Sequence, residues 1–181
     1  MAPFPTLRTE RLLLRQFQSS DAPEVQRLAG AKEVAAGTFL PHPYPPGTAE
    51  QWIASQQEEF DADRLVNFAI VLLRQESLIG SIGLAIVAEH RHARMSYWLG
   101  LPYWNHGYAT EAVEAVLAYG FHQRTLHRIY APHFLSNPAS GRVLQKVGMT
   151  YEGRMREHYR RLGEFVDLEL YAMLEQDFRR R

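Results

Sequence analysis

The sequence predicts a mixed α/β or α+β fold in a single domain. Strand-like and helical segments alternate in the second half of the chain, which favours a partly parallel sheet. Strand-like runs joined by short turns also occur, and these favour antiparallel hairpins. At 181 residues, the chain is within the range of one domain and is long enough to bury a sizeable core.

Turn and capping residues set the bounds of the expected elements. Ser20, Asp21 and Pro23 mark a helix start, and Thr48 with Gln51 resembles a capping box for a later helix. Between these helices, residues 37–47 hold four prolines and two glycines and predict a loop. The expected elements, in chain order, are a strand at 11–17, helices at 22–30 and 49–60, strands at 65–73, 78–87 and 94–99, a helix from about 107, a strand at 128–134, a helix at 138–147 and strands at 150–159 and 165–174.

Composition excludes several functional classes. The formal net charge is zero and there is no cysteine, which argues against a broad nucleic-acid surface and excludes disulfides, thiolate metal sites and a cysteine nucleophile. The basic clusters at 154–161 and 179–181 are interpreted as solvated surface. The longest apolar run, Phe68 to Leu73, is too short to span a bilayer, and the first residues lack a charged leader. We therefore expect a cytoplasmic protein with no membrane, nucleic-acid or metal partner.

A tight turn before the helix from about 107 is the most informative segment. Gly107 has no Cβ, and Asn105 tolerates a left-handed backbone, so successive amides can point inward at the start of the helix. Amides in the first turn of a helix bind phosphate groups. The apolar face of the helix begins with the small residues Ala109 and Ala112, which allow close packing on a sheet.

A second helix start follows the strand at 128–134. Asn137 is expected as the N-cap, Pro138 as the first helical residue and Gly148 as a left-handed C-cap. Two neighbouring parallel strands that each deliver a helix N-terminus to the same sheet edge form a crevice for one extended ligand.

Four blocks of the sequence occur in this order: Thr9–Arg15, Tyr97–Leu99, Trp104–Ala112, and Asn137–Ser140 with Leu144–Met149. Together they resemble the GCN5-related N-acetyltransferases (GNAT), in particular the branch with the RimJ/RimL ribosomal-protein N-terminal acetyltransferases. The resemblance covers about residues 6–178 and implies a GNAT-like fold, in which one mixed, mostly antiparallel sheet is flanked by helices and has two splayed parallel central strands. It implies one acetyltransferase domain over residues 1–181.

The resemblance also implies the reaction and the site. Acetyl-CoA would donate an acetyl group to a primary amine by direct attack in a ternary complex, with no metal. The residues implied to bind CoA are Tyr97, Trp98, Leu99, Asn105, His106, Gly107, Tyr108, Ala109, Thr110, Asn137 and Ser140. Among these, a backbone amide near Tyr97–Leu99 would polarise the thioester carbonyl. Asn137 would contact the pantetheine arm, and Ser140 would protonate or hydrogen-bond the departing thiolate, which makes these two the catalytic candidates.

The sequence departs from many relatives at Arg94, where they often place a glutamate that helps to take a proton from the amine. The general base is therefore unassigned, with His133 as a candidate and Glu157, His158 and Tyr159 as weaker ones. His90 and His92, with Arg91 and Arg94, fit a solvated turn. Candidate acceptor-binding residues are His42, Tyr44, Trp52 and Arg94.

Three functional readings remain open at this stage. The first is acetylation of a protein or peptide α-amine, including a ribosomal protein; an α-amine, with a pKa near ~8, needs less help from a base than a lysine, near ~10.4. The second is acetylation of a small amine such as an amino acid analogue, polyamine or aminoglycoside, which the acidic residues between Glu50 and Asp63 keep open. The third is a silent CoA-binding module. A monomer and a homodimer fit the sequence equally.

Overall fold

Eight strands form one mixed sheet in the part of the chain that the computed structural model describes, residues 3–161 and 163–180. The sheet order is β1-β2-β3-β4-β5-β6-β8-β7. The strands are β1 (Leu7–Arg8), β2 (Leu12–Arg15), β3 (Leu65–Leu72), β4 (Ser77–Val87), β5 (His92–Leu99), β6 (Arg128–Phe134), β7 (Thr150–Arg161) and β8 (Glu164–Leu174). The β5–β6 pair is parallel and the other described pairs are antiparallel. The α+β fold expected from the sequence is confirmed.

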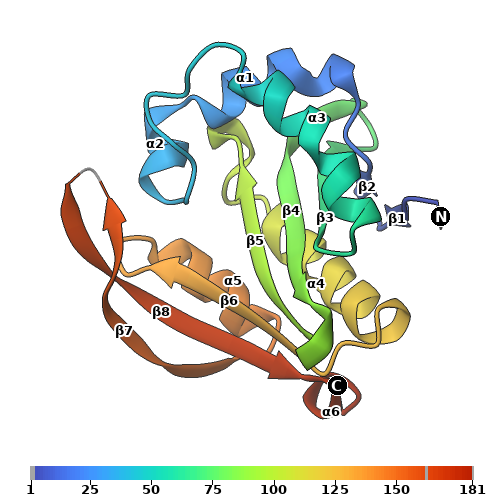
Figure 1. Ribbon diagram of the computed structural model, residues 1–181, viewed down its shortest axis with the longest axis vertical. Helices are drawn as coiled ribbons and strands as arrows, with labels where there is room; N and C mark the ends of the chain where they lie inside the picture. The colour runs from blue at the N-terminus through green and yellow to red at the C-terminus, as the bar shows by residue number, and fades with distance from the viewer. Residues whose placement is uncertain (1–2, 162, 181) are drawn as a thin grey trace.

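Helices cover both faces of this sheet (Figure 1). They are α1 (Ala22–Ala29), α2 (Lys32–Ala36), α3 (Thr48–Asp61), α4 (Tyr108–Ala118), α5 (Pro138–Lys146) and α6 (Glu175–Phe178), and a π-helical turn, Tyr119–Gln123, extends α4. In Figure 1, α3 lies in front of β3 and β4, and α4 lies behind them.

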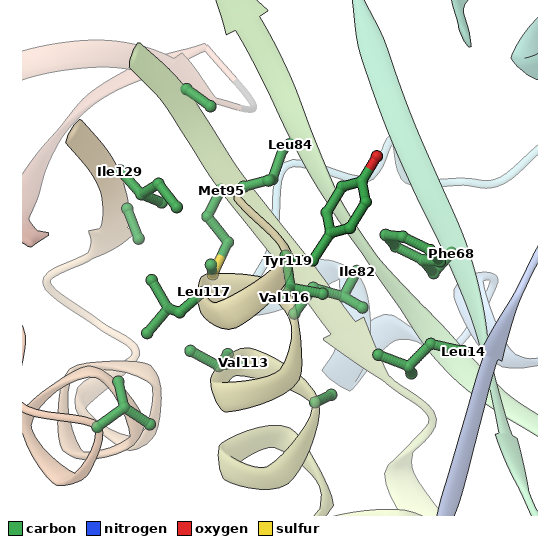
Figure 2. Packing of buried hydrophobic residues seen from close by; sticks show 14 of the residues in the cluster. Leu14, Phe68, Ile82, Leu84, Met95, Val113, Val116, Leu117, Tyr119 and Ile129 are labelled. Atoms are coloured by element: carbon green, nitrogen blue, oxygen red, sulfur yellow. The ribbon is translucent and has the colours of Figure 1, made fainter. Parts of the chain in front are cut away.

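Each face has its own apolar core. Behind the sheet, buried residues of α4 and α5 pack on the inward side chains of the central strands, and Figure 2 shows Val113, Val116 and Leu117 of α4 against Met95 and Ile129. In front, α1 and α3 pack on the alternate side chains of the strands, including Ala69, Val71 and Trp98. Because successive residues of a strand face opposite sides, β5 contributes to both cores.

The local signals at α4 and α5 are confirmed. The apolar face that begins with Ala109 and Ala112 lies against the sheet, and both alanines belong to or pack on the core behind it. Asn137 caps α5 by accepting a hydrogen bond from the amide of Ser140 at 3.2 Å, and Gly148 is left-handed at φ 71°.

Three expectations about the first half of the chain are corrected. The strand expected at 11–17 is shorter, Leu12–Arg15, and pairs with a two-residue strand, β1. The short helix α2, Lys32–Ala36, was not predicted, because the sequence there has neither a polar N-cap nor an apolar pattern long enough to indicate a helix. Thr48 is not a capping residue, because it is already helical and follows Gly47, which is left-handed at φ 83°.

The two parallel strands separate soon after they begin. They pair at only three positions among the described residues, from His92–Arg128 to Arg94–Tyr130. Beyond Arg94, β5 continues along β4, while β6 follows β8, so the two strands diverge in a V that is visible in Figure 1. The edge of β5 that faces β6 is left without a strand partner from Met95 to Leu99. An extended chain can therefore hydrogen-bond to it.

We expect Gly120→Ala to destabilise the protein. An ideal Cβ at this position lies 2.5 Å from Cδ1 of Ile129 and 3.3 Å from Cδ1 of Leu84, both buried in the core. Overpacking of this kind costs about 1–3 kcal/mol, which outweighs the helix propensity gained, and urea unfolding measures it. Ile129→Val removes the clashing atom, so Gly120→Ala should cost less in that background. Equal costs in both backgrounds would contradict this packing.

Candidate functional site

The turn before α4 presents free backbone amides. Asn105 and Gly107 are both left-handed, at φ 61° and 80°, and α4 begins at Tyr108. The amides of Tyr108, Ala109 and Thr110 donate to no group in the described part of the chain. Three such amides at the positive end of a helix suit a phosphate group. Of the other predicted residues here, His106 is exposed and stacks on Tyr108, with ring centroids 5.6 Å apart.

Glu111, in the first turn of α4, is clamped by the turn between β1 and β2. Its carboxylate accepts hydrogen bonds from Oγ1 of Thr9 at 2.6 Å, from the amide of Arg11 at 2.8 Å and from Nε of Arg11 at 2.7 Å. Burial raises the pKa of Glu111, but these hydrogen bonds and the charge of Arg11 outweigh it, so the pKa lies below its usual value. The clamp fixes the start of α4 relative to the sheet edge.

The same clamp brings the guanidinium of Arg11 to the amide turn. Its Nη1 donates to the carbonyl of His106 at 2.9 Å, and its Cζ lies 4.7 Å from the centroid of the Tyr108 ring. Lys146 of α5 lines the same open hollow, together with Gly107 and Thr110. The hollow is also lined by the acidic residues Glu10, Glu111 and Glu114, and Glu111 is paired with Arg11. The features here that suit a phosphate group are the free amides of the turn and the cationic side chains beside them. Sequence reasoning missed Arg11 as a site residue, although it lies inside the first block of the family resemblance.

Across the V, Tyr97 of β5 meets Ser140 of α5. Their hydroxyl oxygens are 2.7 Å apart, and either can be the donor. The Tyr97 hydroxyl, which has one proton, also lies 3.3 Å from the Ser140 carbonyl and can donate to that oxygen instead. Burial raises the pKa of Tyr97 to about 12, although the hydrogen bond with Ser140 lowers it in part. The phenol is therefore neutral and can donate to Oγ of Ser140, which leaves the serine proton free to point elsewhere. Two residues predicted separately are thus brought into one hydroxyl pair at the open edge of β5.

Two neighbours of this pair on β5 are held by packing. Trp98 faces the front core and Leu99 the back core, so they can offer only backbone groups to a ligand. The carbonyl of Leu99 already accepts a hydrogen bond from the indole of Trp104 at 2.8 Å.

Asn137 links α5 to the end of α2. Its Oδ1 caps α5, and its Nδ2 donates to the carbonyl of Gly37 at 2.8 Å. An amide nitrogen carries two protons, so one donor of Asn137 stays available to a ligand.

His133 lies beneath α5. The residue is 4% exposed, its ring stacks on Tyr171 with centroids 5.7 Å apart, and a Cβ on Gly141 would lie 2.9 Å from its Nε2. Its Nε2 is 3.4 Å from the carboxylate of Glu169. This burial separates the ring from solvent and from an incoming amine, so the geometry favours a packing role.

On the front side of the V, three aromatic rings form a cluster. Phe39, Phe134 and Tyr159 contact one another with centroids 4.8 to 5.5 Å apart. The guanidinium of Arg161 lies over Phe134 at 5.0 Å, and that of Arg94 lies over Phe39 at 6.0 Å. The rings come from β6, β7 and the loop after α2, so their meeting could not be read from sequence spacing.

The other candidate acceptor residues have structural contacts. Trp52 packs edge-on against Phe17, with centroids 4.8 Å apart, and Tyr44 is half-buried and accepts a hydrogen bond from Gln26 at its carbonyl. Burial, with the charge of Glu50, raises the pKa of Tyr44. His42 is exposed in the proline-rich loop. Thus Arg94 alone of these four lies against the aromatic cluster in the described contacts.

Residues 3–161 and 163–180 contain no group of three or more histidine, aspartate or glutamate side chains placed to hold a metal ion. In the same residues, no helix has the length and apolar character needed to cross a membrane.

Comparison with known proteins identifies relatives of the whole chain. Residues 11–150 match the family described as the acetyltransferase (GNAT) domain. The chain is 31% identical over 173 residues to the uncharacterized N-acetyltransferase YoaA of Bacillus subtilis, a match that spans 95% of this chain and 98% of YoaA.

Two solved structures share the fold but act on different acceptors. One is RimL, the ribosomal L7/L12 α-N-protein acetyltransferase, in complex with CoA; its TM-score is 0.87 at 17% identity, over 96% of this chain and 99% of RimL. The other is the spermidine N-acetyltransferase of Vibrio cholerae with CoA and spermine, with a TM-score of 0.81 at 21% identity, over 94% of this chain and 99% of that one. At these identities the likeness establishes the fold and does not select an acceptor.

Loss of the Glu111 charge should destabilise the protein in a pH-dependent way. The folded pKa of Glu111 is lowered, so its contribution is fully present above the unfolded pKa, near ~4.3, and is lost as pH falls through the folded value. We expect Glu111→Gln to cost about 1–3 kcal/mol at neutral pH, because it replaces one charged acceptor oxygen of the clamp with an NH₂ group that cannot accept from Arg11. The difference from the unchanged protein should shrink below about pH 4 in urea unfolding.

Glu50→Gln is the matched control, since Glu50 is an exposed acid in the first turn of α3 with no described hydrogen bond to its side chain. A Glu111→Gln cost that is independent of pH, or equal to that of the control, would contradict the clamp.

Proposed function

Since the chain belongs to the GNAT acetyltransferase family and is an N-acetyltransferase, we propose that it transfers the acetyl group of acetyl-CoA to the α-amine of a protein or peptide. The observation that carries the proposal is the Tyr97–Ser140 hydroxyl pair at the open edge of β5, in a protein whose α4 also begins with free amides beside Arg11. A ribosomal protein is one acceptor of this class.

Acetyl-CoA supplies an activated acyl group and a thiolate leaving group. The amides of residues 108–110, with Arg11 and Lys146, would hold its pyrophosphate. The unpaired edge of β5 would hold its extended arm through backbone hydrogen bonds. As the C–N bond forms and the C–S bond breaks, the Ser140 hydroxyl would donate a proton to the leaving sulfur, and the proton lost from the amine nitrogen would pass through water to restore that hydroxyl. Tyr97, whose pKa is raised to about 12, would orient the hydroxyl by donating to its oxygen.

The choice of an α-amine as the acceptor follows from the lack of an assigned general base. Only a neutral amine attacks a carbonyl, and about a tenth of an α-amine, with its pKa near ~8, is neutral at physiological pH. A lysine or an aliphatic polyamine would need far more help. Arg94 occupies the position where many relatives carry a glutamate, and a guanidinium cannot accept a proton. Positioning of an already neutral α-amine would then supply much of the rate.

Three of the acidic residues that favoured a polyamine acceptor bind neighbouring side chains. Glu59 is paired with Arg64, at 2.9 Å, and Asp63 is paired with Arg124. Asp61 accepts a hydrogen bond from Gln57. Glu59 and Asp63 lie at or beyond the C-terminal end of α3, and the arginines paired with them offset their charge, so these two residues do not favour a polycationic acceptor. The silent CoA-binding module is not retained, because the chain belongs to an acetyltransferase family.

A mixed-acceptor assay tests the choice of amine. The protein is incubated with acetyl-CoA, a peptide with a free α-amine and an internal lysine, the same peptide with its α-amine blocked, and spermidine. We expect mass spectrometry to locate one acetyl group on the free α-amine. Acetylation confined to lysine or spermidine would rule the proposal out.

Removal of the Ser140 hydroxyl tests the proposed acid. We expect Ser140→Ala to lower kcat by about 100-fold, the range of general acid catalysis. Tyr97→Phe, which removes only the hydroxyl that orients Ser140, should lower kcat by roughly tenfold. Thiol release at saturating acetyl-CoA measures both. Ser136→Ala, an exposed hydroxyl in the turn before α5, is the control; a Ser140→Ala enzyme as active as this control would contradict the role of Ser140.

A further inference from the structure

Arg94 lies at the base of the V, on the side opposite the Tyr97–Ser140 pair. Its neighbours Ala93 and Met95 are buried in the core behind the sheet, so the Arg94 side chain faces the front. It is the last residue of β5 that pairs with β6. Arg94 therefore stands where β5 and β6 separate, on the face that carries the aromatic cluster of Phe39, Phe134 and Tyr159.

Arg94 is exposed and its charge is not neutralised by a carboxylate in residues 3–161 and 163–180. Its described side-chain contact is with the ring of Phe39, at 6.0 Å. By contrast, arginines elsewhere in the molecule, such as Arg15 and Arg128, form ion pairs with nearby acids. A guanidinium kept free of acids beside a reaction site is available to an anionic group of the ligand.

A second cation reinforces the positive potential at this cluster. Arg161 lies over Phe134, 5.0 Å from the ring centroid, and donates hydrogen bonds to the carbonyls of Ala35, Ala36 and Thr38 at the end of α2. Those carbonyls satisfy its donors and offset only part of its charge. Arg161 thus holds the loop after α2 in place, while the Arg94 guanidinium makes no hydrogen bond to residues 3–161 or 163–180.

We propose that Arg94 binds a carboxylate of the acceptor, so that the preferred substrate is a peptide N-terminus with an acidic residue at its second or third position. This inference rests on the proposed α-amine acetylation. Arg94 lies three residues before Tyr97, or about 10 Å along the strand. An extended acceptor chain advances by about 3.3–3.6 Å per residue from its reacting amine, so side chains at positions two and three come within reach of a long arginine. A polycation would instead be repelled.

Matched peptides test the preference directly. The peptides begin with serine and differ only at the third residue, which is aspartate, asparagine or lysine, and kcat/KM is measured by thiol release at low ionic strength. We expect the aspartate peptide to exceed the asparagine peptide by about tenfold or more, as a charged hydrogen bond allows. The excess should fall with added salt, because Arg94 is exposed.

Variants assign the preference to Arg94. In Arg94→Gln the ratio of aspartate to asparagine peptide should fall to about one, and Arg94→Glu should favour the lysine peptide. Arg74→Gln is the matched control: it removes an equal exposed charge from the turn between β3 and β4, at the far end of the sheet from Arg94, and should keep the full ratio. Thermal unfolding of each variant reports whether it is folded.

Each outcome bears on one claim. Equal kcat/KM for the aspartate and asparagine peptides would overturn the acidic preference and leave α-amine acetylation standing. A preference that survives in folded Arg94→Gln would overturn the assignment to Arg94. Failure to acetylate any of the peptides would overturn the proposed function itself.

Discussion

The early separation of β5 and β6 is the constraint on which the site depends. The strands pair over three positions and then follow different neighbours, so a run of β5 backbone in the middle of the sheet has no strand partner. Unpaired backbone inside a sheet is costly unless something else satisfies it. Here the gap is bridged behind the sheet by Tyr97 and Ser140 and lined in front by aromatic rings. A ligand arm that adds a strand at this edge is stabilised for the same reason.

Polar side chains hold the helix starts around this opening. Glu111 ties α4 to the turn between β1 and β2, and Asn137 both caps α5 and binds the carbonyl of Gly37. These contacts join segments about a hundred positions apart in the chain. They also place Arg11 beside the amide turn, so that one cluster of hydrogen bonds orders the scaffold and adds charge to the anion site.

The sequence predicted those parts of the site whose signals are local. Two such features could be predicted from the sequence: the left-handed backbone at Asn105 and Gly107, and the Asn137 cap. Each depends on side-chain chemistry within a few residues. The same kind of signal failed at Thr48, where a left-handed Gly47 starts the helix instead. The role of Arg11 and the aromatic cluster could not be predicted from the sequence, because residues far apart in the chain form these contacts.

The sequence by itself determined the α+β class, the two helix starts of α4 and α5, and the resemblance to GNAT acetyltransferases. Capping, backbone freedom and apolar periodicity depend on residues within one or two turns of the chain, so a short stretch of sequence is enough to predict them. Only the tertiary structure decided which side of the V each candidate faces. It buried His133 under α5, joined Tyr97 to Ser140, and left Arg94 exposed without a described acid partner. Strand register and the divergence of β5 from β6 govern these outcomes, and both arise from contacts between segments that are remote in sequence.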